Sequence, residues 1–334
     1  PCRGGIRLPA MGENAVPNPL SRASDDGAEP FPHIPPARPV EEIRAHPQFW
    51  IARRRFLLAF STDPQAEGDG STIHLLSDPG RIALFSLIIT LFFQYDPDDR
   101  ATWPTIGLIR RSFLPFGLAS SRRLDAILAR LQSTRLITFA RPSTDRRLRL
   151  VLPTRRMLDL DLDLLTRQFS SLDSVYPESD IGGPLRAGDR RYQRALRHVA
   201  SRTRALAQQP LEQAGRLRSV LAHRHGIKLL APYLMAAHDG DPANICLPFE
   251  DVGSRSLMSR THVRNLFNEL SDLGLARLHR AGGHHVELLP ELLDLADAFI
   301  ASAMTNYARG WAIACWLVEH EPQYAQYFPP APPD

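Results

Sequence analysis

Two sets of apolar residues, 139 positions apart, constrain the fold of this chain more than any other feature. Within each set the order is i, i+3, i+4 and i+7, which places the four side chains on one face of a helix. The first set is Leu124, Ile127, Leu128 and Leu131, and the second is Val263, Leu266, Phe267 and Leu270. Leu275 follows Leu136 at the same spacing. Solenoid repeats are only about 20–50 residues long, so a repeat of this length predicts two copies of one domain.

The same series of elements is predicted around each of these apolar sets, which we call stripes. Two helices come first, a third helix with a serine at its N-cap carries the stripe, and a β-hairpin follows. In the first copy these are helices at 78–94 and 105–113, a cap at Ser120 or Ser121, and strands at 136–139 and 148–152. In the second copy they are helices at 227–237 and 249–254, a cap at Ser259, and strands at 276–280 and 285–289. This is the order of a winged helix, so we expect a mainly α fold with two small β-hairpin wings.

Further helices and polar segments surround the two copies. We expect a helix at 40–60 before the first copy and one at 154–170 after it, with helices at 189–207 and 291–319 in the corresponding places of the second. Elsewhere proline, glycine and serine interrupt the pattern. The predicted division is a disordered Pro-rich tail at 1–39, a first unit at 40–173, a linker at 174–188, a second unit at 189–320 and a Pro-rich tail at 321–334.

The composition permits a polyanionic partner without requiring one. The 334 residues carry a net charge of +4 with a pI near 9.2, and Lys228 is the only lysine among the 40 basic residues. Arginine is well suited to bidentate contact with phosphate and guanine. A GC-rich genome is the simpler explanation of this enrichment, because it raises arginine, alanine and proline together.

Three widely spaced cysteines, without a Cys/His cluster, predict neither a zinc site nor a disulfide framework, and no cofactor is expected. This usage favours a reduced cytoplasmic setting. The apolar run at 82–93 is too short to cross a bilayer, and no signal peptide opens the chain. Residue 1 is proline, so we expect the start to be that of a fragment, with Met11 as a candidate initiator.

The face opposite each stripe carries groups that can contact DNA. In a helix-turn-helix the third helix lies in the major groove, where asparagine bonds adenine and arginine bonds guanine. The outward residues of the first copy are Ser121, Arg122, Arg123 and Arg130, with Ala126 and Ala129 between them. Those of the second copy are Arg260, Thr261, His262, Arg264, Asn265 and Asn268. Any surface helix presents polar residues outward, so these faces indicate DNA contact only because the cap, the stripe and the hairpin occur twice in the same order.

The hairpin tip of the first copy is the most specific local motif. The run DRRLRLVLPT, from Asp145 to Thr154, resembles the wing signature of the MarR family of transcription regulators. The resemblance implies that Arg146 or Arg147 enters the minor groove, that Asp145 steadies the wing or the third helix, and that Thr154 caps the next helix. Narrow minor grooves also attract arginine through their negative potential.

The resemblance weakens at two places. Pro153 stands where the family has leucine, and the second copy lacks the Asp-Arg pair. At its tip the second copy has Arg280 and His284 instead, which we expect to contact phosphate. The family likeness therefore covers residues 75–172 well and residues 190–318 in topology only.

MarR proteins are dimers in which two winged helices address one palindromic site. Both units lie on one chain here, so the resemblance implies an internal MarR-like pseudo-dimer whose recognition helices enter consecutive major grooves. The two outward faces differ, so the half-sites should be unlike. The predicted function is a sequence-specific, double-stranded DNA-binding transcriptional regulator. A small-molecule effector and further homodimerisation are left open.

Charge is unevenly distributed in the second half of the chain. Residues 186–228 hold ten arginines and Lys228 against Asp189 and Glu212, whereas the segment after Val286 has Arg309 alone against seven acids. The basic segment could contact the phosphate backbone, or it could pair with the acidic C-terminal helix across the interface between the units. We favour the second interpretation, because the family's helices in these positions face away from DNA.

No enzyme is predicted, because a Gly-rich phosphate loop, a GxSxG elbow and a helix-borne metal motif are all missing. His284, His285 and Glu287 are interpreted as a solvated tip rather than a metal site, since neighbours on a strand point to opposite faces. Trp311 and Trp316 are interpreted as interface core in preference to a ligand pocket. Two alternatives remain: a plasmid-type replication initiator with tandem winged helices, which should be more basic, and a winged-helix module that binds proteins.

Overall fold

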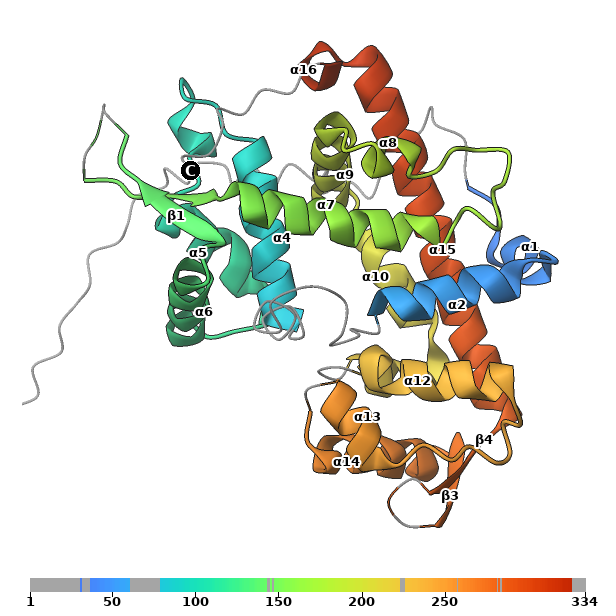
Figure 1. The fold of residues 1–334 in the computed structure, drawn as a ribbon. Coiled ribbons are helices and arrows are strands. Elements are labelled where there is room, and N and C mark those ends of the chain that lie inside the picture. Colours follow the sequence, from blue (N-terminus) through green and yellow to red (C-terminus); the bar gives the residue numbers. More distant parts are fainter. Residues whose placement is uncertain are drawn as a thin grey trace, which may run out of the picture.

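The computed structural model describes residues 31, 37–60, 79–142, 145, 147–222, 226–256, 258–280, 282 and 284–325. The molecule is mainly helical and has two small antiparallel sheets of two strands each (Figure 1). Most of the tail predicted at 1–39 lies outside the described residues, as does 326–334. Among the helices within these ranges, none combines the length and the apolarity that crossing a lipid bilayer would require.

The first unit contains the three helices and the hairpin that the sequence predicts. Its elements are α4 (Pro79–Phe93), α5 (Ile106–Phe113), α6 (Ser121–Ser133), β1 (Ile137–Ala140), β2 (Leu150–Pro153) and α7 (Arg155–Ser170). Side-chain oxygens cap three of these helices, because Thr105, Ser120 and Thr154 accept the backbone N–H groups of Leu108, Arg123 and Met157. The whole stripe of α6 is buried in a core shared with α4 and α5. Two short 3-10 turns, η1 (Arg100–Thr102) and η2 (Leu114–Phe116), flank α5.

The second unit repeats this series. Its elements are α12 (Gly226–Asp239), α13 (Phe249–Arg255), α14 (Arg260–Asp272), β3 (Ala276–Arg280), β4 (His285–Leu288) and α15 (Pro290–His320). The stripe of α14 is buried as predicted. The side-chain cap expected from Ser259 is wrong, because its Oγ lies 2.8 Å from Nδ1 of His262 and caps no backbone N–H. At the turn between α13 and α14, a Cβ on Gly253 would lie 2.9 Å from the carbonyl oxygen of Met258, so this close approach requires glycine.

In both units the hairpin also pairs with a residue that precedes the second helix. Thr105 bridges to Leu150 in the first unit, and Ile245 bridges to Val286 in the second. The backbone N–H of Val151 donates to the carbonyl of Pro104 at 2.8 Å, and the N–H of Val286 donates to the carbonyl of Ile245 at 2.9 Å. These bridges tie each hairpin to its helices, and the sequence did not predict them.

The two stripe-bearing helices end in the same way. Residue Arg135 (φ 57°) follows α6, and residue Gly274 (φ 67°) follows α14, both in the left-handed conformation. The next backbone N–H reaches back to the helix in each case, from Leu136 to Leu131 at 2.9 Å and from Leu275 to Leu270 at 2.8 Å. Glycine adopts this conformation without strain, whereas arginine does not.

Replacing Arg135 by glycine should therefore raise the free energy of unfolding by roughly 0.5–1 kcal/mol, because the strain of a side chain in the left-handed region is removed. The reverse change at the equivalent position, Gly274→Ala, should lower it by about 1 kcal/mol. Urea denaturation measures both effects. Gln132→Gly is the control, since a glycine inside α6 should cost about 1 kcal/mol. A loss of stability in Arg135→Gly would contradict the interpretation.

The helices predicted before each unit are broken. The single helix expected at 40–60 is wrong, because α1 (Val40–Ala45) and α2 (Phe49–Phe60) are separated around Pro47, and His46 before this proline is extended. The single helix expected at 189–207 is also wrong, because Thr203 divides α9 (Arg190–Arg202) from α10 (Arg204–Gln213). The remaining short helices are α8 (Gly183–Arg186), η3 (Gly215–Leu217), α11 (Arg218–Ala222) and α16 (Pro322–Ala325).

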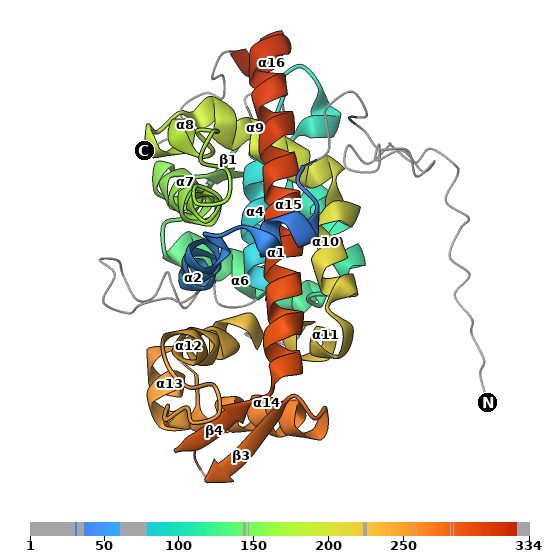
Figure 2. The same cartoon turned by 90° about the vertical axis from the view of Figure 1, so that its right-hand side faces the viewer.

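The leading helix of each unit packs on the other unit. Helix α2 contacts α12 and α15 of the second unit, and α9 contacts α4 and α7 of the first. The long helix α15 runs through the middle of the molecule, and both α1 and α9 pack against it (Figure 2). Trp311 of this helix is buried, with its ring 5.3 Å from that of Tyr192, whereas Trp316 is half-buried and stacks on His320. The segment predicted as a linker, 174–188, contains α8 and buries Val175, Tyr176, Ile181 and Leu185.

Two arginines of the basic segment pair with acids of α7. Arg190 and Arg197 pair with Asp159 and Asp161 of this helix, so the prediction that they face the acidic C-terminal helix is wrong. The prediction is right for Arg216, which pairs with Glu291 at the start of α15. Two other acids of α15 pair instead with the N-terminal helices, Asp294 with Arg44 and Asp297 with Arg53. The sequence alone could not identify these partners, since they depend on which helices are neighbours.

Candidate nucleic-acid interface

The outward face of α6 carries arginine and small side chains. Burial of the stripe leaves Ser121, Arg122 and Arg130 exposed, while Arg123 is half-buried. The small residues Ala126 and Ala129 lie exposed on the same helix. The acid on this helix, Asp125, is neutralised by Arg110 of α5, whose Nη2 lies 2.7 and 2.9 Å from the two carboxylate oxygens. The face is therefore positively charged overall and has room for close approach of a polyanion.

The outward face of α14 carries a richer set of hydrogen-bonding groups. All six residues predicted for it are exposed, and they are Arg260, Thr261, His262, Arg264, Asn265 and Asn268. Arg260 also lies beside the hairpin turn, because a Cβ on Gly282 would come 3.1 Å from its Nη2. The start of α14 and the tip of the second hairpin thus form one continuous surface.

The first hairpin tip is held by a contact that the sequence did not predict. The carboxylate of Asp145 accepts the backbone N–H of Arg147 at 3.1 Å and pairs with Arg100 at 2.6 Å. The guanidinium of Arg100 in turn lies over the ring of Trp103, 5.3 Å from its centroid. Asp145 therefore steadies the tip against the η1 turn rather than against α6. Arg100 lies 45 residues earlier in the chain, so no local motif could have identified it.

The arginines of this hairpin lie in different surroundings. Arg147 is exposed beside Asp145, as is Arg141 at the other side of the hairpin. Arg146 lies outside the described residues. Arg149, two residues after Arg147, packs on its own hairpin, with its guanidinium 4.2 Å from the ring centroid of Phe139.

The second hairpin pairs its acid internally. Glu287 accepts from Arg277 at 3.0 Å and bonds Nε2 of His279 at 2.8 Å, and the bond from His279 lowers the pKa of this carboxyl. The ring of His279 lies 4.5 Å from that of His285. Arg280 and His284 remain exposed at the tip. Within the described residues no group of three His, Cys, Asp or Glu side chains could hold a metal ion.

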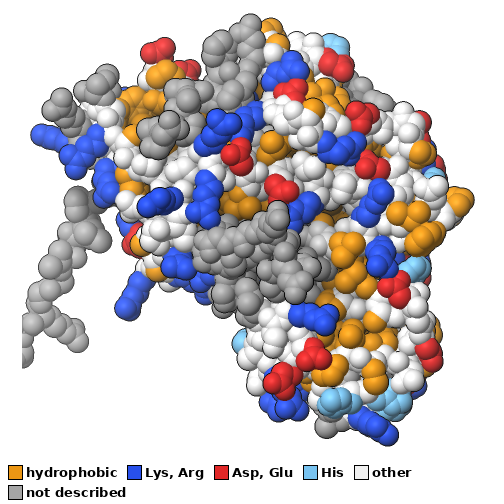
Figure 3. All heavy atoms as spheres, viewed as in Figure 1, with side chains coloured by type: hydrophobic (Ala, Val, Ile, Leu, Met, Phe, Trp, Pro, Cys, Tyr) orange, Lys and Arg blue, Asp and Glu red, His pale blue; other side chains and the backbone are white. Residues whose placement is uncertain are grey.

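Basic side chains gather on the surfaces that these elements form. Figure 3 shows Lys and Arg side chains spread over the first unit at the left of the view, and Arg and His side chains at the lower edge of the second unit, where β3 and β4 lie in Figure 1. Comparison with known protein families, with curated proteins and with solved structures finds no match to this chain.

Proposed function

We propose that this chain is a sequence-specific, double-stranded DNA-binding transcriptional regulator built from two winged helices. One observation carries the proposal: in each unit a helix buries its apolar stripe, exposes a polar face and is followed by a hairpin with exposed arginine at its tip. An α-helix fits the major groove, and arginine beside it suits the minor groove or the phosphates. The MarR-like wing of the first unit agrees with this assignment.

The roles of the residues follow from their chemistry. Arg122 of α6 and Asn265 of α14 are proposed to contact base edges, because guanidinium and carboxamide groups form bidentate bonds with guanine and adenine. The N-terminal end of each helix is also the positive pole of its dipole, which favours a phosphate nearby. Arg147 and Arg280 are proposed to contact the minor groove or the backbone from the two wings.

The arrangement of the acids supports a polyanionic partner. The three carboxylates of α6 and the two hairpins are each paired with a cation. They are Asp125 with Arg110, Asp145 with Arg100, and Glu287 with Arg277 and His279. Pairing removes most of the repulsion that these acids would exert on phosphate.

The reciprocal packing of the leading helices supports an internal pseudo-dimer. Helix α2 contacts α12 and α9 contacts α4, which is the relation expected of two units around an approximate two-fold axis. Such a pair would present two recognition helices to one DNA site. Because Arg122 and Asn265 belong to different units, the two half-sites should differ in sequence.

A protein-interaction module is the weaker candidate. A protein-binding face would have an apolar centre. The most exposed large apolar side chains among the described residues are Trp50, Leu58, Ile82 and Leu118, and none of them belongs to α6, α14 or a hairpin.

Selection of fragments from genomic DNA at two salt concentrations tests the proposal. We expect retained fragments that share one site near promoters, with an affinity that falls steeply as salt increases because phosphate contacts release counterions. Repeated sites at a replication origin would favour the initiator instead. Absence of any retained fragment at low salt would contradict DNA binding.

A further inference from the structure

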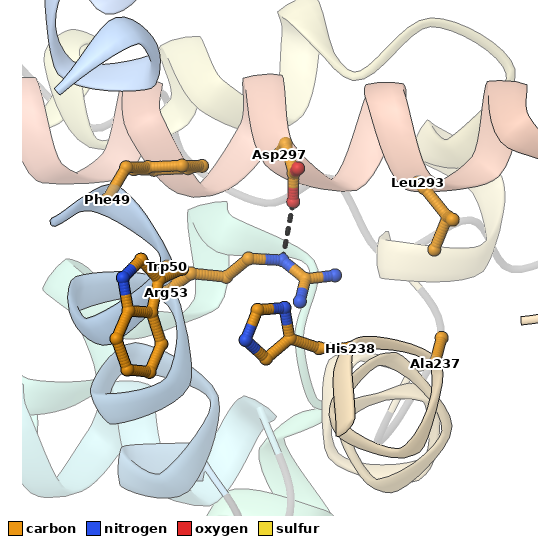
Figure 4. Close-up of a pocket in the computed structure, with 7 residues that line it drawn as sticks. All are labelled: Phe49, Trp50, Arg53, Ala237, His238, Leu293 and Asp297. Carbon is orange, nitrogen blue, oxygen red and sulfur yellow. Dashed lines mark hydrogen bonds and ion pairs between the residues drawn. The ribbon is translucent and has the colours of Figure 1, made fainter. Parts of the chain in front are cut away.

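A cavity of about 190 Å³ lies where the two units meet, and nothing in the proposed DNA contacts uses it. Helix α2 forms one wall with Phe49, Trp50 and Arg53, α12 forms another with Ala237 and His238, and α15 closes it with Leu293 and Asp297 (Figure 4). Pockets that bind drug-sized ligands measure about 300–1,000 Å³. The smaller volume of this cavity suits a single ring with a short polar group.

The polar wall of the cavity is one ion pair. Nε of Arg53 donates to Asp297 at 2.5 Å, and Nη1 reaches the carbonyl of Leu234 at 3.3 Å. The Arg53 side chain is only 8% exposed, whereas that of Asp297 is 30% exposed. Within the described part of the chain, Arg53 is the one hydrogen-bond donor to the Asp297 carboxylate, so that carboxylate can accept more. Burial raises the pKa of Asp297, although Arg53 opposes the shift.

The other junction between the units has an equivalent ion pair, whose carboxylate is fully buried. There Arg197 of α9 pairs with Asp161 of α7 and donates to Ser86 of α4. In the same way, Arg53 of α2 pairs with Asp297 of α15 and donates to the carbonyl of Leu234 of α12. The carboxamide of Gln193 completes this site, because its Nε2 donates to Asp161 Oδ2 and to the carbonyl of Leu158, both at 2.8 Å. Its Oε1 accepts from Arg190 at 3.2 Å.

The junction that holds the cavity lacks this amide. Gln193 stands four residues before Arg197, and the residue four before Arg53 is Phe49. Phe49 offers a ring but no donor for Asp297. The aromatic wall continues with Trp50, which is half-exposed and stacks on His238 with ring centroids 5.7 Å apart. An aromatic surface and an incompletely bonded carboxylate therefore lie side by side.

We propose that this cavity binds a small, uncharged aromatic carboxamide. The ligand amide gives Asp297 the N–H that Gln193 gives Asp161 at the other junction. Its carbonyl accepts from Arg53, while its ring lies against Trp50 and His238. An anion or a cation fits less well, because Arg53 and Asp297 already neutralise each other and an added charge would stay uncompensated.

Ligand-observed NMR titration of the full chain with benzamide, benzoate and benzamidine tests the inference. We expect benzamide to bind with a Kd on the order of 1 mM, as a fragment of this size can. Benzoate and benzamidine should bind at least about tenfold more weakly. Tighter binding of either charged probe, or no binding of benzamide, overturns the proposal.

Substitutions test whether the ligand binds in the cavity. Trp50→Ala should weaken benzamide binding about three- to tenfold through loss of stacking. Leu58→Ala is the matched control, because Leu58 is an exposed residue of α2 outside the cavity and its loss should leave the affinity unchanged. Phe49→Gln supplies the missing amide and should abolish binding, with thermal unfolding as the check that the variant folds. Unchanged affinity in Trp50→Ala overturns the assignment.

Any effect of the ligand on DNA binding rests on the proposed function, whereas binding of the ligand to the protein alone does not. Because α2 bridges to α12 and α15 beside the cavity, an occupant there would change how the two units are held. Benzamide binding without DNA binding would therefore contradict the regulator and leave the cavity assignment standing.

Discussion

Replacing Asp161 with alanine should lower the free energy of unfolding by about 3–5 kcal/mol, because it breaks a buried ion pair from one side. Asp161 is completely buried, and the side chain of its partner Arg197 is 14% exposed. The substitution would leave a guanidinium with little water to solvate it, and Gln193 would lose one of its acceptors. Chemical denaturation followed by far-UV circular dichroism measures the loss.

A surface pair on the same helix is the control. Asp163 pairs with Arg167 one turn later, and both side chains are about half exposed, at 48% and 49%. Asp163→Ala should cost less than about 0.5 kcal/mol. Replacing Asp161 and Arg197 together by leucine and methionine should recover much of the loss, because no buried charge is then left alone. Equal losses in Asp161→Ala and Asp163→Ala would show that the buried network does not hold the units together.

Replacing one outward side chain on each recognition helix by alanine should have the largest effect on DNA binding. Arg122→Ala and Asn265→Ala should each cost roughly 1–3 kcal/mol, which is a loss of about 5- to 150-fold in affinity for the preferred site. The reason is that each removes one bidentate contact to a base while the helix stays folded, since both side chains are exposed. Mobility shift at fixed salt measures the affinities.

Two further variants separate the contribution of base contacts to affinity from that of overall positive charge. Arg167→Ala removes the same charge from α7, away from the proposed surface, and should change affinity little. Arg147→Ala should weaken binding to all sequences and reduce the slope of affinity against salt by about one phosphate contact. If Arg122→Ala and Asn265→Ala bind like the parent protein, the wrong helices have been assigned.

The sequence predicted those parts of the fold that depend on local pattern. The spacing of Leu124 and its partners predicts a buried face, and the helix has that face buried. Ser120 and Thr154 cap helices at the positions where polar residues precede apolar periods. These predictions succeed because hydrophobic periodicity and capping act over a few residues.

The remaining features depend on contacts between distant segments. Arg100 holds Asp145 across 45 residues, and Arg53 reaches Asp297 across 244. No local pattern indicates that α2 packs on the second unit or that α9 packs on the first. The cavity could not be predicted for the same reason, because its walls come from α2, α12 and α15.

Hydroxyl-radical footprinting on a selected DNA fragment tests whether two unlike winged helices of one chain bind one site. We expect protection of two half-sites of different sequence, centred about one helical turn (10–10.5 base pairs) apart. Arg122→Ala should lift protection mainly over one half-site, and Asn265→Ala mainly over the other. A perfect palindrome with equal loss over both halves in each variant would contradict the account.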